Sequence, residues 1–285
     1  MLNPFDKENK DIAWCKGCGN FLILDILKTA MFEVGLSPLS TVLVSGIGQA
    51  AKLPQYVNCN FFNGLHGRAL PVATGIKLAN KSLNVIVTSG DGDMYGEGGN
   101  HFIHTIRRNP NITMLIHNNM VYGLTKGQPS PTYFSENLED HSSFIEPFNP
   151  ISVALALNAS FVARIFCQDK EASIKIIKEA ILHRGTSIVD VFQPCVTYNK
   201  INTYKWFKEN TYYIDENYKA DDRQEAFALA LKTDKLPLGI FYKDPSRVVF
   251  ESNDKNFAKT RDPLYIKSLK PDFNGKLEKL IKSFM

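Results

Sequence analysis

Long apolar runs are missing from this 285-residue sequence. No stretch approaches the roughly 20 consecutive apolar residues that cross a membrane, and the polar first residues, 1–11, do not resemble a signal peptide. Lysine and arginine form no run longer than pairs such as Arg107-Arg108, and the net charge is only +4. We therefore expect no membrane anchoring, no nucleic-acid binding and a cytoplasmic location.

Cysteine is also scarce, and its spacing does not suggest a disulfide framework. The sequence contains no internal repeat and no low-complexity segment, and it is 44% hydrophobic, enough to bury a full core. In a reducing compartment, metal binding or catalysis is the better explanation for cysteines that lie close together. The five are Cys15, Cys18, Cys59, Cys167 and Cys195.

Short apolar, β-branched segments alternate along the chain with segments of helical periodicity. Strands that are apolar at nearly every position are typical of a sheet covered on both faces. The alternation predicts an α/β fold, an open and mostly parallel sheet with helices on both faces. Strands are expected at 41–45, 84–89, 112–117, 161–166 and 187–192, and helices at 19–34, 68–79, 100–108 and 170–182.

The alternation of strand-like and helix-like segments weakens after Pro194, which suggests that the chain has two parts. We expect residues 1–198 to form the α/β domain with an N-terminal cysteine motif, and residues 199–285 to form an extension that packs on this domain or on a partner subunit. The long polar connection 125–150 is expected to be functional or disordered. In the extension we expect a helix at 225–232, a loop containing Pro237 and Pro245, and a basic terminal helix at 276–285.

The strongest motif follows two consecutive predicted strands. Gly90-Asp91-Gly92-Asp93 ends one strand, and Asn118-Asn119 ends the next, about two dozen residues later. Ligands of open parallel sheets bind at these strand ends. Mg²⁺ prefers oxygen ligands and commonly accompanies a diphosphate, so the Asp91 carboxylate, the Asn119 amide oxygen and the Val121 carbonyl are candidate ligands. Gly90 and Gly92 would allow close approach of the backbone.

This motif resembles the diphosphate-binding motif of thiamine-diphosphate enzymes. Further motifs make the chain, from about Trp14 to about Arg247, similar to the β subunit of 2-oxoacid:ferredoxin oxidoreductases, the 2-oxoglutarate and pyruvate synthase group. They are Trp14-Cys15-x-x-Cys18-Gly19-Asn20, Ser45-Gly46-Ile47-Gly48, Leu65-His66-Gly67-Arg68-Ala69, Gly98-Gly99-Asn100-His101, Leu124-Thr125-Lys126-Gly127-Gln128 and Gln193-Pro194-Cys195.

The resemblance implies a thiamine-diphosphate-binding domain with Mg²⁺ and oxidative decarboxylation of a 2-oxoacid to acyl-CoA and CO₂. The electrons would pass through an iron–sulfur cluster to ferredoxin, and the cofactor would supply the difficult chemistry. Pyruvate and 2-oxoglutarate fit the motifs equally, with a weak preference for the 2-oxoglutarate type. The aminopyrimidine-binding domain and its activating glutamate would belong to an α, or fused γα, subunit, so we expect an obligate heteromer.

The resemblance also implies site residues. Asp93, Asn118, His66 and Gly46-Ile47-Gly48 would join the diphosphate motif in binding the cofactor. Lys52 and Lys126 would face the substrate carboxylate, with an exposed surface lysine as the alternative for each. His66 would polarise the substrate carbonyl or hold a phosphate, unless it is structural. The basic residues Lys7, Lys10 and Lys16 could help to dock an acidic ferredoxin.

The cysteines match the family only in part. A zinc ribbon would need a second close cysteine pair, and a thioredoxin-like dithiol would need a preceding strand, for which there is no room. The resemblance implies a [4Fe–4S] cluster on Cys15, Cys18 and Cys195, but Gln49 stands where the family usually has its fourth cysteine. Three alternatives follow: Cys59 completes the set, another ligand such as one from a partner chain completes it, or no cluster forms. Cys167 is expected to be a core residue.

Three functions therefore compete. The first is the ferredoxin-linked oxidoreductase. The second is a non-redox thiamine-diphosphate-dependent 2-oxoacid decarboxylase without a cluster, which Gln49 favours. The third is an assembly subunit that binds no cofactor, and the combination of Asp91 with Asn118-Asn119 argues against it.

Overall fold

The computed structural model describes residues 3–8, 11–134, 146–232, 234–253, 263 and 272–284. Within these ranges, no helix is both long enough and apolar enough to cross a membrane.

An eight-stranded sheet forms the centre of the fold, with the order β2-β1-β3-β4-β8-β7-β10-β9. Six consecutive strands from β2 to β7 are parallel, β10 is antiparallel to β7, and β9 is parallel to β10. The prediction of a mostly parallel sheet is confirmed. The strands are β1 (Thr41–Ser45), β2 (Asn60–Asn63), β3 (Asn84–Gly90), β4 (Thr113–Asn118), β7 (Phe161–Phe166), β8 (Ser187–Phe192), β9 (Thr211–Tyr213) and β10 (Leu236–Lys243).

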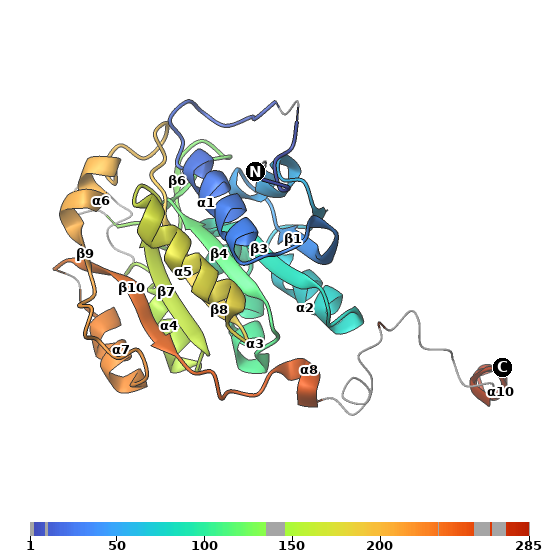
Figure 1. Cartoon of the computed structure of the whole chain (residues 1–285). Helices are drawn as coiled ribbons and strands as arrows, with labels where there is room; N and C mark the ends of the chain where they lie inside the picture. Colours follow the sequence, from blue (N-terminus) through green and yellow to red (C-terminus); the bar gives the residue numbers. More distant parts are fainter. Residues whose placement is uncertain are drawn as a thin grey trace.

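Helices cover both faces of the sheet (Figure 1). α1 (Asn20–Glu33) and α5 (Lys170–Leu182) contribute to one buried apolar cluster. On the opposite face, α2 (Ala69–Ala79), α3 (Gly99–Arg108), α4 (Pro150–Ala156) and α7 (Arg223–Ala230) contribute to a second cluster. The central strands are therefore buried on both sides, as their uniformly apolar sequences predict.

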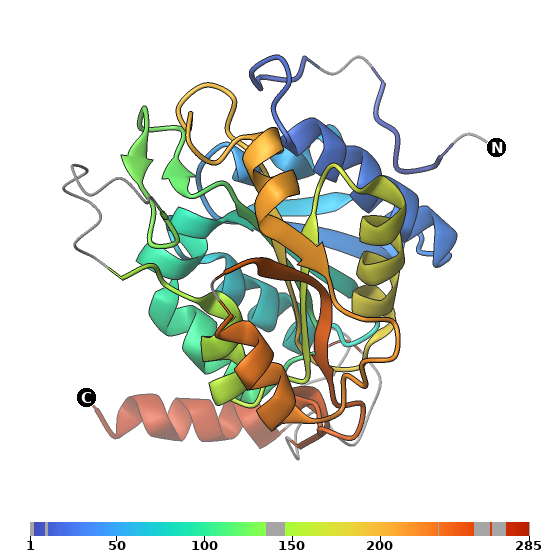
Figure 2. The same cartoon turned by 90° about the vertical axis from the view of Figure 1, so that its left-hand side faces the viewer.

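The remaining elements are short or peripheral. Figure 2 shows the small hairpin and α6 beside the sheet from a second direction. These elements are η1 (Pro38–Ser40), η2 (Ala50–Tyr56), the π-helical turn η3 (Gly92–Glu97), the hairpin strands β5 (Val121–Tyr122) and β6 (Gln128–Pro129), α6 (Tyr204–Asn210), α8 (Phe250–Asn253) and α10 (Asp272–Lys282).

Several helix ends follow local capping rules. The Asn149 side chain accepts from Ser152 N at the start of α4, where Pro150 occupies the first turn. Asp222 caps α7 by accepting from the backbone N–H groups of Gln224 and Glu225. This cap starts α7 two residues before the start expected from periodicity.

The loop expected around Pro237 is wrong, because β10 occupies it. The pairing with β7 begins at Gly239 and runs to Lys243, so the missing N–H of Pro237 falls outside that ladder. Pro237 itself lies opposite Tyr212 of the three-residue edge strand β9. Strand β2 was also not predicted, since its side chains are all exposed and show no buried face.

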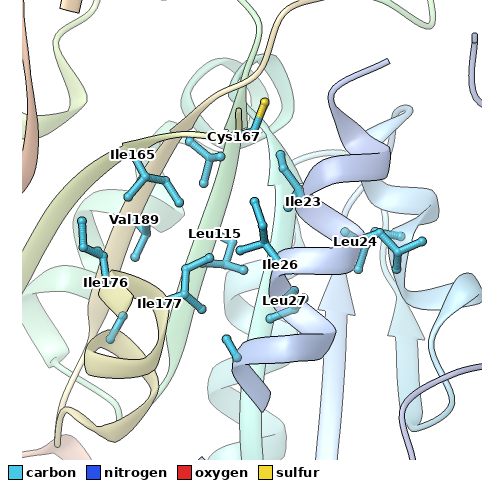
Figure 3. Close-up of a cluster of buried hydrophobic side chains, with 14 of the residues drawn as sticks. Ile23, Leu24, Ile26, Leu27, Leu115, Ile165, Cys167, Ile176, Ile177 and Val189 are labelled. Carbon is cyan, nitrogen blue, oxygen red and sulfur yellow. The ribbon is translucent and has the colours of Figure 1, made fainter. Parts of the chain in front are cut away.

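The core cluster beneath α1 and α5 should tolerate truncation poorly. Figure 3 shows Leu115 of β4 among side chains of these two helices, such as Ile26 and Ile177. Leu115 is fully buried, so Leu115→Ala should lower the free energy of unfolding by about 2–5 kcal/mol through lost burial and a residual cavity. Chemical denaturation measures this value.

The matched control is Leu182→Ala at the end of α5, where the side chain is 68% exposed. This change should alter the free energy of unfolding by less than about 0.5 kcal/mol. Equal losses in the two variants would contradict the assignment of the core.

Candidate functional site

A cleft of about 750 Å³ opens at the carboxyl ends of β1, β3 and β4. This is where ligands bind in open α/β sheets. Its walls come from the turn after β1, the Gly90–Asp93 segment after β3 and the hairpin after β4. Its lining residues are Ile47, Gly48, Gln49, Ala50, His66, Gly90, Asp91, Gly92, Asp93, Glu97, Asn119, Val121, Tyr122, Gly123, Leu124, Thr125 and Gln128.

Asp91 is the buried carboxylate at the base of this cleft, and it is 1% exposed. Its Oδ2 atom accepts from Met120 N at 3.1 Å, from Ser130 Oγ at 2.5 Å and from Thr132 Oγ1 at 2.7 Å. Burial raises the pKa of Asp91 to about 6, although the hydrogen bonds from Ser130 and Thr132 lower it. A bound cation would favour the ionised form of this carboxyl group.

Two further residues in this cleft offer oxygen atoms that could bind a metal ion. Asn119 and Val121 line it beside Asp91. The Asn119 Oδ1 atom accepts from Val121 N at 3.0 Å, and the Asn119 carbonyl accepts from Asn199 Nδ2 at 3.1 Å. A carboxylate, an amide oxygen and a backbone carbonyl are hard ligands of the kind that Mg²⁺ prefers, so the donor set fits this ion.

Asp93 holds the walls of the cleft together and is itself mostly buried. It accepts from Ser89 Oγ at 2.5 Å, from Ile47 N at 3.2 Å and from Gly67 N at 2.8 Å. A Cβ atom on Gly46 would lie 1.9 Å from Asp93 Oδ2. Gly46 is therefore required for the contact between the turn after β1 and this carboxylate.

Asn118 points to the other side of the wall that Asn119 helps to form. It donates from Nδ2 to Asp190 Oδ1 at 3.1 Å, and its Oδ1 atom lies 2.8 Å from Thr132 Oγ1. It is absent from the lining of the cofactor cleft, whereas Asn119 is present. In the described structure, Asn118 thus supports Asp91 through Thr132 and does not face the cleft.

The three residues expected to contact the substrate lie in different settings. His66 is exposed and lines the cleft, whereas Lys52 and Lys126 do not line it. Lys52 is half-buried in η2. Lys126 is exposed in the turn closed by Gly127 N donating to Tyr122 O, and its φ of 75° is in the left-handed region.

Tyr122 and Glu97 line the cleft but were not identified from the sequence. The pKa of Tyr122 is raised to about 12, first by burial and then by the neighbouring Glu97 carboxylate. The Tyr122 ring covers the glycine motif so closely that a Cβ on Gly92 would lie 2.3 Å from it. A tyrosine three residues after the Asn-Asn pair was the available signal, although its partner Gly92 is 30 positions away.

Cys15 and Cys195 both lie within electrostatic range of Cys18 near the start of α1, but among the described residues these three thiols are not grouped closely enough to hold a metal ion. The pKa of Cys18 is raised to about 11, mainly by burial, with smaller contributions from the Cys195 and Cys15 thiols. Gln193 Nε2 donates to Cys18 Sγ at 3.6 Å. Cys59 lies elsewhere, packed against the core near the Leu43 backbone, and no other cysteine influences its pKa.

Trp14 links Gln49 to the cysteine motif. It precedes Cys15 in the sequence, and its Nε1 atom donates to the Gln49 carbonyl at 2.9 Å. The Gln49 Oε1 atom is buried and has no hydrogen-bond partner in the described structure. Within the described ranges, no three His, Cys, Asp or Glu side chains are grouped to hold a metal ion. Three thiols and an amide do not fit a four-thiolate cluster.

The remaining residues named in the sequence analysis are Cys167 and the three lysines near the N-terminus. Cys167 is fully buried in the core beneath α1. Lys7 is exposed and donates to the Gln55 carbonyl at 2.9 Å, and Lys16 is exposed. Lys10 lies outside the described residues, as does segment 135–145 of the long polar connection.

Comparison with known proteins gives the family. Residues 40–191 match the model of the C-terminal thiamine-pyrophosphate-binding domain of thiamine pyrophosphate enzymes, and residues 195–259 match the C-terminal model of the pyruvate ferredoxin oxidoreductase beta subunit. The chain is 42% identical to subunit beta of 2-oxoacid:ferredoxin oxidoreductase 2 of Aeropyrum pernix, over 84% of this chain and 82% of that one. This chain belongs to the β subunits of the 2-oxoacid:ferredoxin oxidoreductases.

Other relatives agree. Subunit beta of the Saccharolobus solfataricus 2-oxoacid:ferredoxin oxidoreductase is 41% identical over 89% of this chain and 87% of that one. A structure of the 2-oxoglutarate:ferredoxin oxidoreductase from Magnetococcus marinus, with 2-oxoglutarate, coenzyme A and succinyl-CoA bound, superimposes with a TM-score of 0.86 at 34% identity. The superposition covers 98% of this chain and 96% of the Magnetococcus marinus chain. The expected family, the fold and the assignment as an enzyme subunit are confirmed.

The close contact at Gly46 generates a prediction. Gly46→Ala should displace Asp93 and release Ile47 N and Gly67 N, which lowers thiamine-diphosphate affinity by about tenfold or more, or ~1.4 kcal/mol. Titration calorimetry in the presence of Mg²⁺ measures this affinity.

Gly75→Ala in α2 is the control, because a Cβ there meets nothing within 4 Å. It should leave cofactor affinity unchanged and stabilise the helix by roughly 0.5–1 kcal/mol. Unchanged affinity in Gly46→Ala would show that Asp93 does not organise the cleft.

Proposed function

We propose that this β subunit binds thiamine diphosphate through Mg²⁺ in the cleft at the carboxyl ends of β1, β3 and β4. The observation that carries this proposal is the set of three oxygen donors on Asp91, Asn119 and Val121 around one cleft. Three hydrogen bonds already hold Asp91 Oδ2, which leaves Oδ1 for the ion. Gly90 carries no side chain and lets a diphosphate approach the backbone.

The reaction we propose is the oxidative decarboxylation of a 2-oxoacid to acyl-CoA and CO₂, with ferredoxin as the electron acceptor. The bound cofactor would act as the electron sink for loss of CO₂. The chain's own contribution is to fix the diphosphate and to exclude water with the Tyr122 ring. His66 lines the cleft, and Lys52 and Lys126 closely follow the cleft-lining residues Ala50 and Thr125 in the sequence. These three side chains would attract the carboxylate of the substrate.

The substrate we propose is 2-oxoglutarate or pyruvate. The Magnetococcus marinus structure contains 2-oxoglutarate and coenzyme A, and a relative from Mycobacterium tuberculosis, 41% identical over 67% of this chain and 52% of that one, is a 2-oxoglutarate oxidoreductase subunit. These similarities support 2-oxoglutarate. Pyruvate remains the alternative because the matched C-terminal model is that of pyruvate enzymes.

The reaction requires a partner in our proposal. The relatives are subunits beta, which implies an α subunit. That subunit, or a fused γα chain, would provide the aminopyrimidine-binding domain and the activating glutamate. The cleft is open to solvent in the single chain, and the partner would close it and exclude water.

A second function is favoured by Gln49. If no cluster forms, the complex would be a non-redox 2-oxoacid decarboxylase that keeps Asp91 and Asn119. Cys15, Cys18 and Cys195 are the residues with which this chain would hold iron, but these three thiols do not complete a ligand set. Reduction of ferredoxin by the complex on addition of 2-oxoglutarate and coenzyme A separates the two functions. Release of CO₂ without reduction of ferredoxin would favour the decarboxylase.

The metal assignment predicts the effect of Asp91→Asn. This variant should lower Mg²⁺-dependent thiamine-diphosphate affinity by at least about 100-fold, since loss of even an indirect ligand contact costs 10–100-fold. The apo variant should be no less stable at pH 7. Burial raises the pKa of Asp91 above its unfolded value, so the stability it contributes at low pH is lost as the pH rises through about 6.

Asp215→Asn, at an exposed position, is the control and should bind the cofactor like the wild type. Chelation of Mg²⁺ should weaken binding in the wild type but not further in Asp91→Asn. A chelator effect of the same size in both proteins would place the ion elsewhere.

The Gln49 position predicts a gain of iron. In complex purified without oxygen, Gln49→Cys should hold about four irons and four sulfides per β chain, because it completes a four-thiolate set. The wild type should hold clearly fewer. Iron and sulfide analysis, with electron paramagnetic resonance after reduction, measures both.

Cys18→Ser in the Gln49→Cys background is the control and should abolish the gain. A full cluster in the wild type would mean that another ligand replaces the missing thiolate. Cys59→Ser would then decide the source, since loss of iron would identify Cys59 and retention would point to the partner chain.

A further inference from the structure

A second cavity of about 1120 Å³, also open to solvent, lies beyond the wall of the cofactor cleft. The segment after β4 separates the two. Asn119 and Val121 line the cofactor cleft, whereas Asn118 and Met120 line the second cavity. The proposed function makes no use of this cavity.

Arg164 of β7 lies at the base of the second cavity and is only 5% exposed. Its Nε atom donates to Asp190 Oδ2 at 3.0 Å. No acceptor within the described ranges binds its Nη1 or Nη2 atom. Neither atom is among the fully enclosed polar atoms that lack a partner, so both reach the open cavity. The end of this guanidinium is thus available to a ligand.

The guanidinium is also held in a fixed plane. Its Cζ atom lies 4.9 Å from the centroid of the Phe192 ring and 5.8 Å from that of the Phe241 ring. The Asp190 carboxylate is fully buried and is further satisfied by Tyr95 Oη at 3.2 Å and Asn118 Nδ2 at 3.1 Å. A planar fork with two free donors is suited to pairing with a carboxylate.

Four aromatic side chains contribute to the walls of the cavity, and the charges at its rim are exposed. Phe134, Phe148, Phe192 and Trp206 supply flat apolar surface. Glu146, Lys232 and Asp234 lie at the rim, where solvent screens them. Arg164, paired with the enclosed Asp190, is therefore the charge that matters at the base. The lining also includes the polar residues Asn118, Thr132, Asn149 and Asn210. Apolar surface with a few convergent polar groups is typical of small-molecule sites.

We propose that this cavity binds a small organic carboxylate with a flat apolar body, and that Arg164 pairs with the carboxylate. This site is independent of the proposed function, since it lies outside the cofactor cleft.

The site is connected to the cofactor cleft by a chain of buried hydrogen bonds. Arg164 contacts Asp190, Asp190 contacts Asn118, and the Thr132 hydroxyl lies within 2.8 Å of Asn118 Oδ1 and 2.7 Å of Asp91 Oδ2. A ligand that reorients Arg164 would therefore act on the side chain that we assign to Mg²⁺. Any such coupling must be reciprocal between the two sites.

The test uses the complex of this chain with its partner, saturated with thiamine diphosphate and Mg²⁺. The probe is 4-fluorobenzoate, observed by ¹⁹F nuclear magnetic resonance. Line broadening should show binding, and the neutral analogue 4-fluorobenzamide should bind at least about tenfold more weakly, since it cannot form the ion pair. Equal binding of the two probes would overturn the proposal, and so would binding of 4-fluorobenzoate only to complex that lacks thiamine diphosphate.

Two variants locate the probe. Arg164→Gln combined with Asp190→Asn removes both buried charges together, which avoids an uncompensated ion, and should abolish binding. Leu231→Glu adds a negative charge at an exposed lining position and should weaken binding about fivefold or more. Leu182→Glu, an exposed change outside the cavity, is the control and should bind like the wild type. Wild-type affinity in both cavity variants would overturn the site.

Discussion

The buried carboxylate of Asp91 is the constraint on which the site depends. An ionised group without solvent needs several donors or a cation, and the fold supplies donors from Met120, Ser130 and Thr132. These contacts bring the end of β3 to the segment that follows β4. The same segment separates the cofactor cleft from the Arg164 cavity, so the position of one carboxylate organises both.

Much of the fold could be predicted because its signals are local. The five central strands are apolar at nearly every position, and the four predicted helices show clear periodicity, so their ends differ from the prediction by at most one residue. The Gly-Asp-Gly and Asn-Asn segments could be assigned to one edge because parallel strands end together. β10 was missed because its proline suggested a loop, while its pairing with β7 is set by distant residues.

The remaining parts of the site depend on contacts between distant residues. Ser130 and Thr132 are about 40 positions from Asp91, and Arg164 is 26 positions from Asp190, so no local pattern indicated them. Asn118 and Asn119 are adjacent in sequence, yet they face opposite cavities because the chain alternates direction there. Gln49 was visible in the sequence, but only the structure shows that Cys59 lies away from the other cysteines.

The central claim is that this subunit supplies the diphosphate half of a shared thiamine-diphosphate site. The most direct measurement is release of ¹⁴CO₂ from 2-oxoglutarate or pyruvate labelled at carbon 1. It should be made on the β subunit alone, on the α subunit alone and on the two combined, with thiamine diphosphate and Mg²⁺ present. The account predicts release only from the combined subunits. Release from the β subunit alone, or none from a complex that retains the cofactor, would contradict it.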